Sequence, residues 1–137
     1  MSASVQQRSQ QKQAITKEND MSTRSLIGFN NGSIRGMYCH YDGYPKHVGK
    51  ILVEHYSSSE SVEFLTQGSS IRNFDHDGTV CRFGEGDGGV ETYGTIQEAL
   101  DSGFDYVYMF DDQWICYGRD RFGIATTIDI PNNLTVE

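Results

Sequence analysis

The apolar positions between residues 25 and 130 fall into short runs separated by turn residues. The run from Ser25 to Phe29 predicts a strand, and Asn31-Gly32 after it favours a type I′ hairpin turn, in which both central residues have positive φ. A return strand is expected from Ile34 to Tyr41, because Met37, Cys39 and Tyr41 alternate along it. The pattern therefore predicts a β-hairpin at the start of the folded chain.

From Pro45 onward the apolar residues recur with the spacing of a helix. Proline is suited to the first turn of a helix, because the backbone N–H that it lacks has no partner at that position. Residues at i, i+3, i+4, i+7 and i+8 would form the buried face of this helix against the hairpin, with the histidine among them half-buried: Val48, Ile51, Leu52, His55 and Tyr56. Ser57 and Glu60 match a capping box, so a second short helix is expected to run to Gly68.

The second half repeats this mixture of strands and short helices. Residues 69–78 are rich in turn formers, 79–83 predict a strand, and 84–89 form a glycine-rich acidic loop. Thr95 and Glu98 match a capping box for a helix that ends at Gly103. Aromatic strands at 106–110 and 114–117 predict a second hairpin, and a last strand is expected at 124–130.

These elements predict a small α+β domain, mainly an antiparallel sheet built from two hairpins with two to three short helices packed on it. A chain of 137 residues suits one domain. Residues 1–20 are polar and are expected to be disordered, 21–131 to form the domain, and 132–137 to be a polar tail. No apolar run reaches the roughly 18 residues that a bilayer span needs, so a soluble protein that stays in the cytoplasm of its cell is expected.

Negative charge is concentrated in one quarter of the chain. Of the net charge of −8, residues 75–112 contribute ten acids against a single base. Such a surface disfavours direct nucleic-acid or membrane binding and favours a protein partner with a basic surface, although a solvated acidic face is the plainer interpretation. The candidate partner-binding residues are Asp75, Asp77, Glu85, Asp87, Glu91, Asp101, Asp105, Asp111 and Asp112.

Motifs for a cofactor or a metal are weak. Gly84, Gly86 and Gly89 satisfy G-x-G-x-x-G, but acids stand where a pyrophosphate would sit and no helix is expected after them. The run Asp75 to Asp77 lacks the other oxygen ligands of a calcium loop, so a turn is the expected structure. Three cysteines without Cys-x-x-Cys spacing predict buried, reduced thiols. No cofactor and no metal are expected.

The best candidate for a functional junction is the corner between the first hairpin and the first helix, with His40, Asp42, Tyr44 and His47. Residues two apart on a strand share a face, so His40 and Asp42 could pair as a general base and its orienter do. The sequence indicates no nucleophile beside them. The structural alternative is a local network in which Asp42 accepts backbone N–H bonds and fixes the turn.

Three blocks of sequence carry a resemblance: Thr23-Arg-Ser-Leu-Ile-Gly28, Tyr38-Cys-His-Tyr-Asp-Gly-Tyr-Pro45, and Val48-Gly49 followed by Glu54-His-Tyr56. Together with the aromatic strand before Trp114, they resemble a family of small uncharacterised proteins of tailed bacteriophages and prophages. Tyr41 stands where many relatives have Trp. The resemblance implies phage origin and the cytoplasm of an infected bacterium, and it implies no activity or catalytic residue.

Three functions are compatible with these observations. The first is a non-enzymatic phage accessory protein whose acidic face binds and modulates a bacterial host protein, such as a defence or nucleic-acid-handling enzyme, and inhibits it. The second is a small enzyme or ligand-binding domain that uses His40, Asp42 and Tyr44. The third is a minor virion component. The oligomeric state is left open by the sequence.

Overall fold

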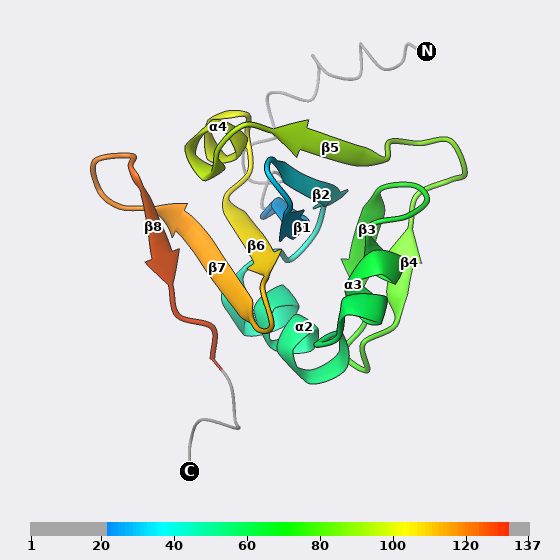
Figure 1. Ribbon diagram of the computed structural model, residues 1–137. Helices are drawn as coiled ribbons and strands as arrows, with labels where there is room; N and C mark the ends of the chain where they lie inside the picture. Colours follow the sequence, from blue (N-terminus) through cyan, green and yellow to red (C-terminus); the bar gives the residue numbers. More distant parts are fainter. Residues whose placement is uncertain (1–21, 132–137) are drawn as a thin grey trace, which may run out of the picture.

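The fold is seen in a computed structural model that describes residues 22–131, so the expectations for 1–20 and 132–137 lie outside the described part of the chain. Eight strands form one sheet in the order β4-β3-β2-β1-β6-β7-β8, and β5 also pairs with β2 (Figure 1). The strands are β1 Ser25–Asn30, β2 Ile34–Cys39, β3 Ile71–Phe74, β4 Val80–Arg82, β5 Val90–Tyr93, β6 Tyr106–Phe110, β7 Trp114–Arg119 and β8 Ala125–Ile128. The helical segments are η1 Pro45–Gly49, α2 Lys50–His55, α3 Ser59–Leu65 and α4 Ile96–Asp101.

Both predicted hairpins are present. β1 and β2 pair antiparallel, as do β6 and β7, and Phe110 faces Trp114 with ring centroids 5.2 Å apart. The hairpins lie side by side because β1 and β6 pair in parallel, from Ser25 opposite Tyr106 to Gly28 opposite Met109. The chain is therefore a mainly antiparallel α+β domain in which β1 and β6, and also β2 and β3, pair in parallel.

Two strands that the sequence pattern did not predict share the outer edge of β2. β5 pairs antiparallel with its first residues, and β3 pairs in parallel at Cys39. Residues 69–78 therefore contain a strand as well as turns, with Ile71 and Phe74 both buried.

Alternation along the strands produces a core on each face of the sheet. On one face, η1, α2 and α3 contribute Val48, Leu52 and Leu65 to a core that also contains Ile27 and Tyr108. On the other face, α4 covers a smaller core, with α4 beside β6 and β5 in Figure 1. Its buried residues are Leu26, Ile34, Ala99, Leu100, Phe104, Val107 and Met109.

The first hairpin turn differs from the prediction. Gly32 has a φ of 111°, but Asn31 does not have positive φ, so the turn is not type I′. Three residues link Asn30 to its partner Ile34, and the Asn31 N–H donates to the Ser33 carbonyl oxygen. The Asn30 side chain accepts a hydrogen bond from the Gly32 N–H at 3.0 Å. This contact pairs a backbone donor within the turn.

The predicted helix after Pro45 begins with a π-helical turn, η1, and continues as α2. Val48, Ile51 and Leu52 are buried as expected, whereas His55 is exposed. The capping box of α3 lies one residue later than predicted and consists of Ser58 and Ser61.

The predicted box at α4 forms only in part. The Thr95 side chain accepts from the Glu98 N–H. The Glu98 carboxylate accepts from the Gly94 N–H instead of from Thr95. The Glu98 side chain therefore caps the N–H of Gly94, one residue before the predicted Thr95.

Candidate functional site

The predicted junction lies where β2 ends. Asp42 has a φ of 56°, so the alternation of a strand does not continue from His40 to Asp42, and the prediction that both share a strand face was wrong. The Gly43 N–H donates to the Thr23 carbonyl oxygen at 2.8 Å. A Cβ at Gly43 would lie 2.7 Å from that oxygen, so only glycine lets the chain pass so close.

His40 belongs to a short line of hydrogen bonds. Its Nδ1 lies 2.5 Å from the Tyr38 hydroxyl, and Arg24 Nε donates to that hydroxyl at 3.1 Å. The Tyr38 hydroxyl therefore makes two hydrogen bonds, one accepted from Arg24 Nε and one shared with His40 Nδ1, whose donor is set by the imidazole tautomer. Burial raises the pKa of Tyr38, and the Arg24 hydrogen bond opposes this rise. The arrangement holds a neutral phenol against the imidazole.

His47 belongs to a different group. Its Nε2 lies 2.9 Å from the Phe74 carbonyl oxygen, and its ring makes an edge contact with His76 at a centroid distance of 5.3 Å. Tyr44 stands next to His47, with their rings 6.3 Å apart. A pocket of about 490 Å³ opens here, lined by Tyr44, Lys46, His47, Lys50, Ile51, Glu54 and His76.

The four predicted junction residues therefore do not form one site, and Asp42 lies in the turn between the other three. Tyr44 and His47 share the pocket, whereas His40 contacts Tyr38, Tyr41 and Phe83. The sequence reasoning missed Arg24, Tyr38, Lys46, Lys50 and His76. Of these, only Lys46 and Lys50 carried a local signal, because they lie four apart on the expected helix and so on one face.

The acids of 75–112 are spread over the sheet. Asp105 and Asp111 stand at opposite ends of β6, directly before and after it. Four others flank the edge strand β4, in the turn before it and the loop after it, and all four are exposed: Asp75, Asp77, Glu85 and Asp87.

Hydrogen bonds engage other members of the predicted set. Glu91 accepts from the Tyr93 hydroxyl, and Asp105 accepts from the Arg24 N–H at 2.9 Å. Asp101 contacts Arg119 at 3.4 Å. Asp77 accepts from the Thr79 N–H, and this bond lowers the pKa of Asp77. These carboxylates therefore contribute to the fold as well as to surface charge.

The single base of this segment, Arg82, points away from the acids. It donates to the Ser69 carbonyl oxygen at 2.7 Å and to the Phe64 carbonyl oxygen at 3.0 Å. Its guanidinium also lies 5.5 Å from the centre of the Phe64 ring. Arg82 thus binds carbonyl oxygens at the carboxyl-terminal end of α3 and forms no salt bridge with the carboxylates around β4.

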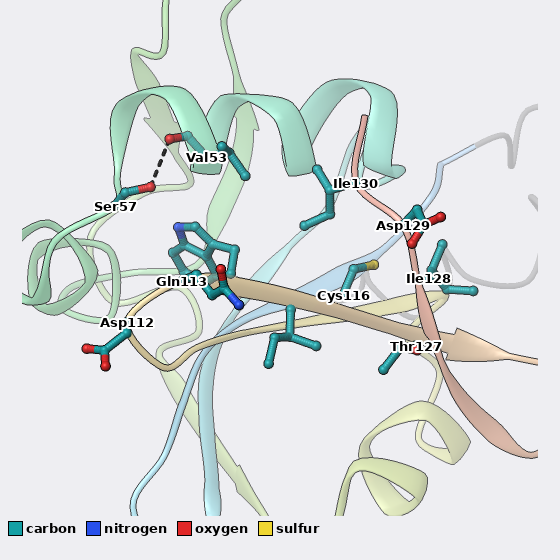
Figure 2. Close-up of a pocket in the computed structure, with 11 residues that line it drawn as sticks. Val53, Ser57, Asp112, Gln113, Cys116, Thr127, Ile128, Asp129 and Ile130 are labelled. Carbon is teal, nitrogen blue, oxygen red and sulfur yellow. Dashed lines mark hydrogen bonds between the residues drawn. The ribbon is translucent and has the colours of Figure 1, made fainter. Parts of the chain in front are cut away.

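The second half contains a further pocket, of about 340 Å³, between α2 and strands β7 and β8 (Figure 2). Trp114 Nε1 donates to the Tyr56 carbonyl oxygen, and Ser57 donates to the Val53 carbonyl oxygen. Asp112 and Asp129 lie at opposite ends of this pocket in Figure 2. The Ser57 hydroxyl is thus engaged by the helix backbone, and the two carboxylates lie apart.

All three cysteines are free thiols, and Cys39 and Cys116 are buried as predicted, whereas Cys81 is partly exposed. Burial raises the pKa of Cys39 and of Cys116 to about 12. A thiol of so high a pKa is a poor nucleophile at neutral pH because the thiolate is the reactive form. The two buried thiols therefore serve packing.

The glycine-rich loop leads into a strand. Gly86 and Gly88 have positive φ, and β5 begins at Val90, where a dinucleotide-binding motif would start a helix. Within residues 22–131, no group of three or more His, Cys, Asp or Glu side chains is arranged to hold a metal ion. In the same range, no helix has the length and apolar character to cross a bilayer.

Comparison of the chain with protein-family models, with curated proteins and with solved structures gave no match. The fold defines a small α+β domain, and the resemblance to phage proteins stays a prediction from the sequence.

Proposed function

We propose that the chain is a non-enzymatic accessory protein of a bacteriophage that binds a host protein in the bacterial cytoplasm and modulates it. The target has a basic surface and is a defence or nucleic-acid-handling enzyme that the complex inhibits. The binding surface is the set of carboxylates around β4, namely Asp75, Asp77, Glu85 and Asp87, called the β4 acids below.

The observation that carries this proposal is the orientation of Arg82. As the one cation of residues 75–112, it would neutralise neighbouring acids if it faced them. Its hydrogen bonds to the backbone near α3 keep it turned inward instead. Among residues 22–131, the β4 acids have no Lys or Arg within 4.0 Å. Uncompensated charge of one sign speeds encounter with a partner of opposite charge and selects against other partners.

The position of β4 adds a second argument. β4 is the last strand in the sheet order, so its outer backbone edge faces no other strand of the described chain. An exposed strand edge can accept an extended segment of a partner through main-chain hydrogen bonds. Acids at both ends of β4 would favour a segment that carries Lys or Arg.

Two other functions stay open as alternatives. One alternative is a ligand-binding or enzymatic role at His40, Asp42 and Tyr44. It was predicted because His40 and Asp42 were expected to share a strand face, and they do not. His40 nevertheless forms a hydrogen bond with Tyr38. A role as a minor virion component is compatible with the same fold.

The test is capture of a partner from a bacterial lysate, with two charge-matched variants. In Asp75→Lys/Glu85→Lys/Asp87→Lys, three β4 acids are reversed. In Glu63→Lys/Asp111→Lys/Asp129→Lys, three exposed acids elsewhere are reversed, so the net charge changes equally. A protein captured at equal stoichiometry by the wild type and the control, and lost with the first variant, supports the proposal. Capture that survives in the first variant contradicts it.

A further inference from the structure

We propose that the pocket beside η1 and α2, lined by Lys46, Lys50, His47 and His76, binds a phosphomonoester. This site is distinct from the β4 acids and does not depend on the proposed function. It assigns a small-molecule ligand to a protein whose overall charge of −8 points instead to cationic partners.

Neither of the two ammonium groups in the pocket forms a salt bridge among the described residues. Lys46 and Lys50 are four residues apart on continuous helical turns, which places both on one side of the segment. Among the residues that the structure describes, no carboxylate lies within 4.0 Å of either ammonium group. Glu54 lines the same pocket, and its ion-pair contact is with His55 at 4.0 Å. Unpaired ammonium groups that line a concave site favour a polyanionic ligand.

Of the two histidines, His76 can offer an N–H to a ligand, whereas His47 uses its own N–H within the fold. The Phe74 carbonyl oxygen can only accept, so His47 Nε2 carries the proton of their 2.9 Å hydrogen bond, and this bond fixes the ring. His76, from the turn between β3 and β4, meets the His47 ring edge-on. Lysine and histidine side chains are common donors to phosphate oxygens, and here the fold brings them to one pocket.

The acids on either side of His76 do not oppose the ligand, because they do not line the pocket. The Asp77 carboxylate accepts from the Thr79 N–H within its own turn. Asp75 Oδ1 lies 4.0 Å from the Cys81 sulfur, toward β4. The His76 imidazole therefore lines the pocket, whereas the Asp75 and Asp77 carboxylates do not.

The volume of the pocket and the aromatic side chain in its lining limit the class of ligand that can bind. A volume of about 490 Å³ falls within the range of small-molecule sites. Tyr44 is 40% exposed, and its ring offers a surface on which a planar group can stack. A phosphate group would contact the two lysines and His76, and the planar group of a nucleoside monophosphate would contact Tyr44.

The experiment is an NMR titration of the full ¹⁵N-labelled chain with inorganic phosphate, adenosine 5′-monophosphate and adenosine. Lys46→Gln/Lys50→Gln removes both ammonium groups. Arg35→Gln/Arg121→Gln removes two positive charges outside the pocket and serves as the matched control. We expect phosphate-bearing probes to shift the amide signals of His47 and Lys50, and the lysine variant to weaken binding about tenfold or more, because charged hydrogen bonds are lost. The control should change the affinity less than about twofold.

The probes distinguish the two sources of a phosphate group. If adenosine 5′-monophosphate binds more tightly than phosphate and Tyr44→Ala removes the difference, the ligand is a nucleotide-like phosphomonoester. Equal affinities assign the site to the phosphate group alone and still support an anion site. Absence of shifts at about 10 mM of either phosphate probe, or equal binding by the lysine variant and the control, overturns the proposal.

Discussion

The hydroxyl of Tyr108 donates a hydrogen bond of 2.7 Å to the carbonyl oxygen of Gly43, across 65 residues of sequence. Tyr108 lies in β6 and is fully buried, and Gly43 lies in the turn that leads into η1. This contact fixes the turn that presents Tyr44 and His47 to their pocket. It is thus a direct link between the central parallel strands and the proposed phosphate site.

Tyr108→Phe is therefore expected to lower the free energy of unfolding by about 1–3 kcal/mol, because it leaves a buried carbonyl oxygen without its donor. Tyr117→Phe, on the opposite face of the sheet, is the control and should change stability less. Urea denaturation followed by fluorescence measures both variants. Equal stability of Tyr108→Phe and the wild type would show that the bond does not hold the turn.

Gly28 and Gly36 face each other across β1 and β2, and this contact admits no side chain at position 28. A Cβ at Gly28 would lie 1.8 Å from the Arg35 carbonyl oxygen. Gly28→Ala is expected to destabilise the domain by more than about 4 kcal/mol, because main-chain atoms must move apart. At Gly84 the nearest atom would be an Asp87 carboxylate oxygen at 3.2 Å, so Gly84→Ala is a mild control. Circular dichroism and thermal melting separate the outcomes, and a folded Gly28→Ala variant of normal stability would contradict the packing.

Thiol reactivity should distinguish the cysteines in the native protein. With a pKa of about 12, each buried thiol is ionised in roughly one molecule in ten thousand at about pH 8. We expect iodoacetamide at this pH to modify Cys81 first, and Cys39 and Cys116 only after addition of urea. Mass spectrometry of the alkylated peptides gives the order. Early modification of Cys39 would show that its site opens to solvent.

The same thiols predict how stability depends on pH. Their ordinary pKa is 9.0, and folding raises it to about 12, so between these values the folded chain retains protons that the unfolded chain loses. The free energy of unfolding should therefore fall as the pH rises from about 9 to 12, and burial of Tyr108 acts in the same direction. Urea titrations across this range should show the fall, and it should be smaller for Cys116→Ala. An identical slope for the variant would contradict the contribution of this thiol.

The hairpins could be predicted from sequence because their partner strands are close in the chain. β3 could not, since a register shift between Ile71 and Asn73 places Ile71 and Phe74 both in the core and hides the period of two. β5 has four residues and is a strand because it pairs with distant β2. Local rules also misplaced the cap of α3 by one residue, since Ser57, Ser58 and Ser61 are chemically alike and only the backbone selects among them.

The site was predictable only in part for a related reason. Tyr44 and His47 are close in sequence, and their shared pocket agrees with the predicted junction. The Phe74 carbonyl that fixes His47 lies 27 residues away, and no sequence pattern points to it. The inward turn of Arg82 likewise depends on the end of α3 and could not be read from the charge count of residues 75–112.

The most direct test of the proposed function is a binding titration between this chain and the host protein that it captures. Calorimetry would compare the wild type, Asp75→Lys/Glu85→Lys/Asp87→Lys and Glu63→Lys/Asp111→Lys/Asp129→Lys. We expect the first variant to lose affinity by about a hundredfold or more, and the control to stay within about threefold of the wild type. Equal losses in both variants would show that net charge, and not the β4 acids, drives binding, and unchanged affinity in the first variant would contradict the account.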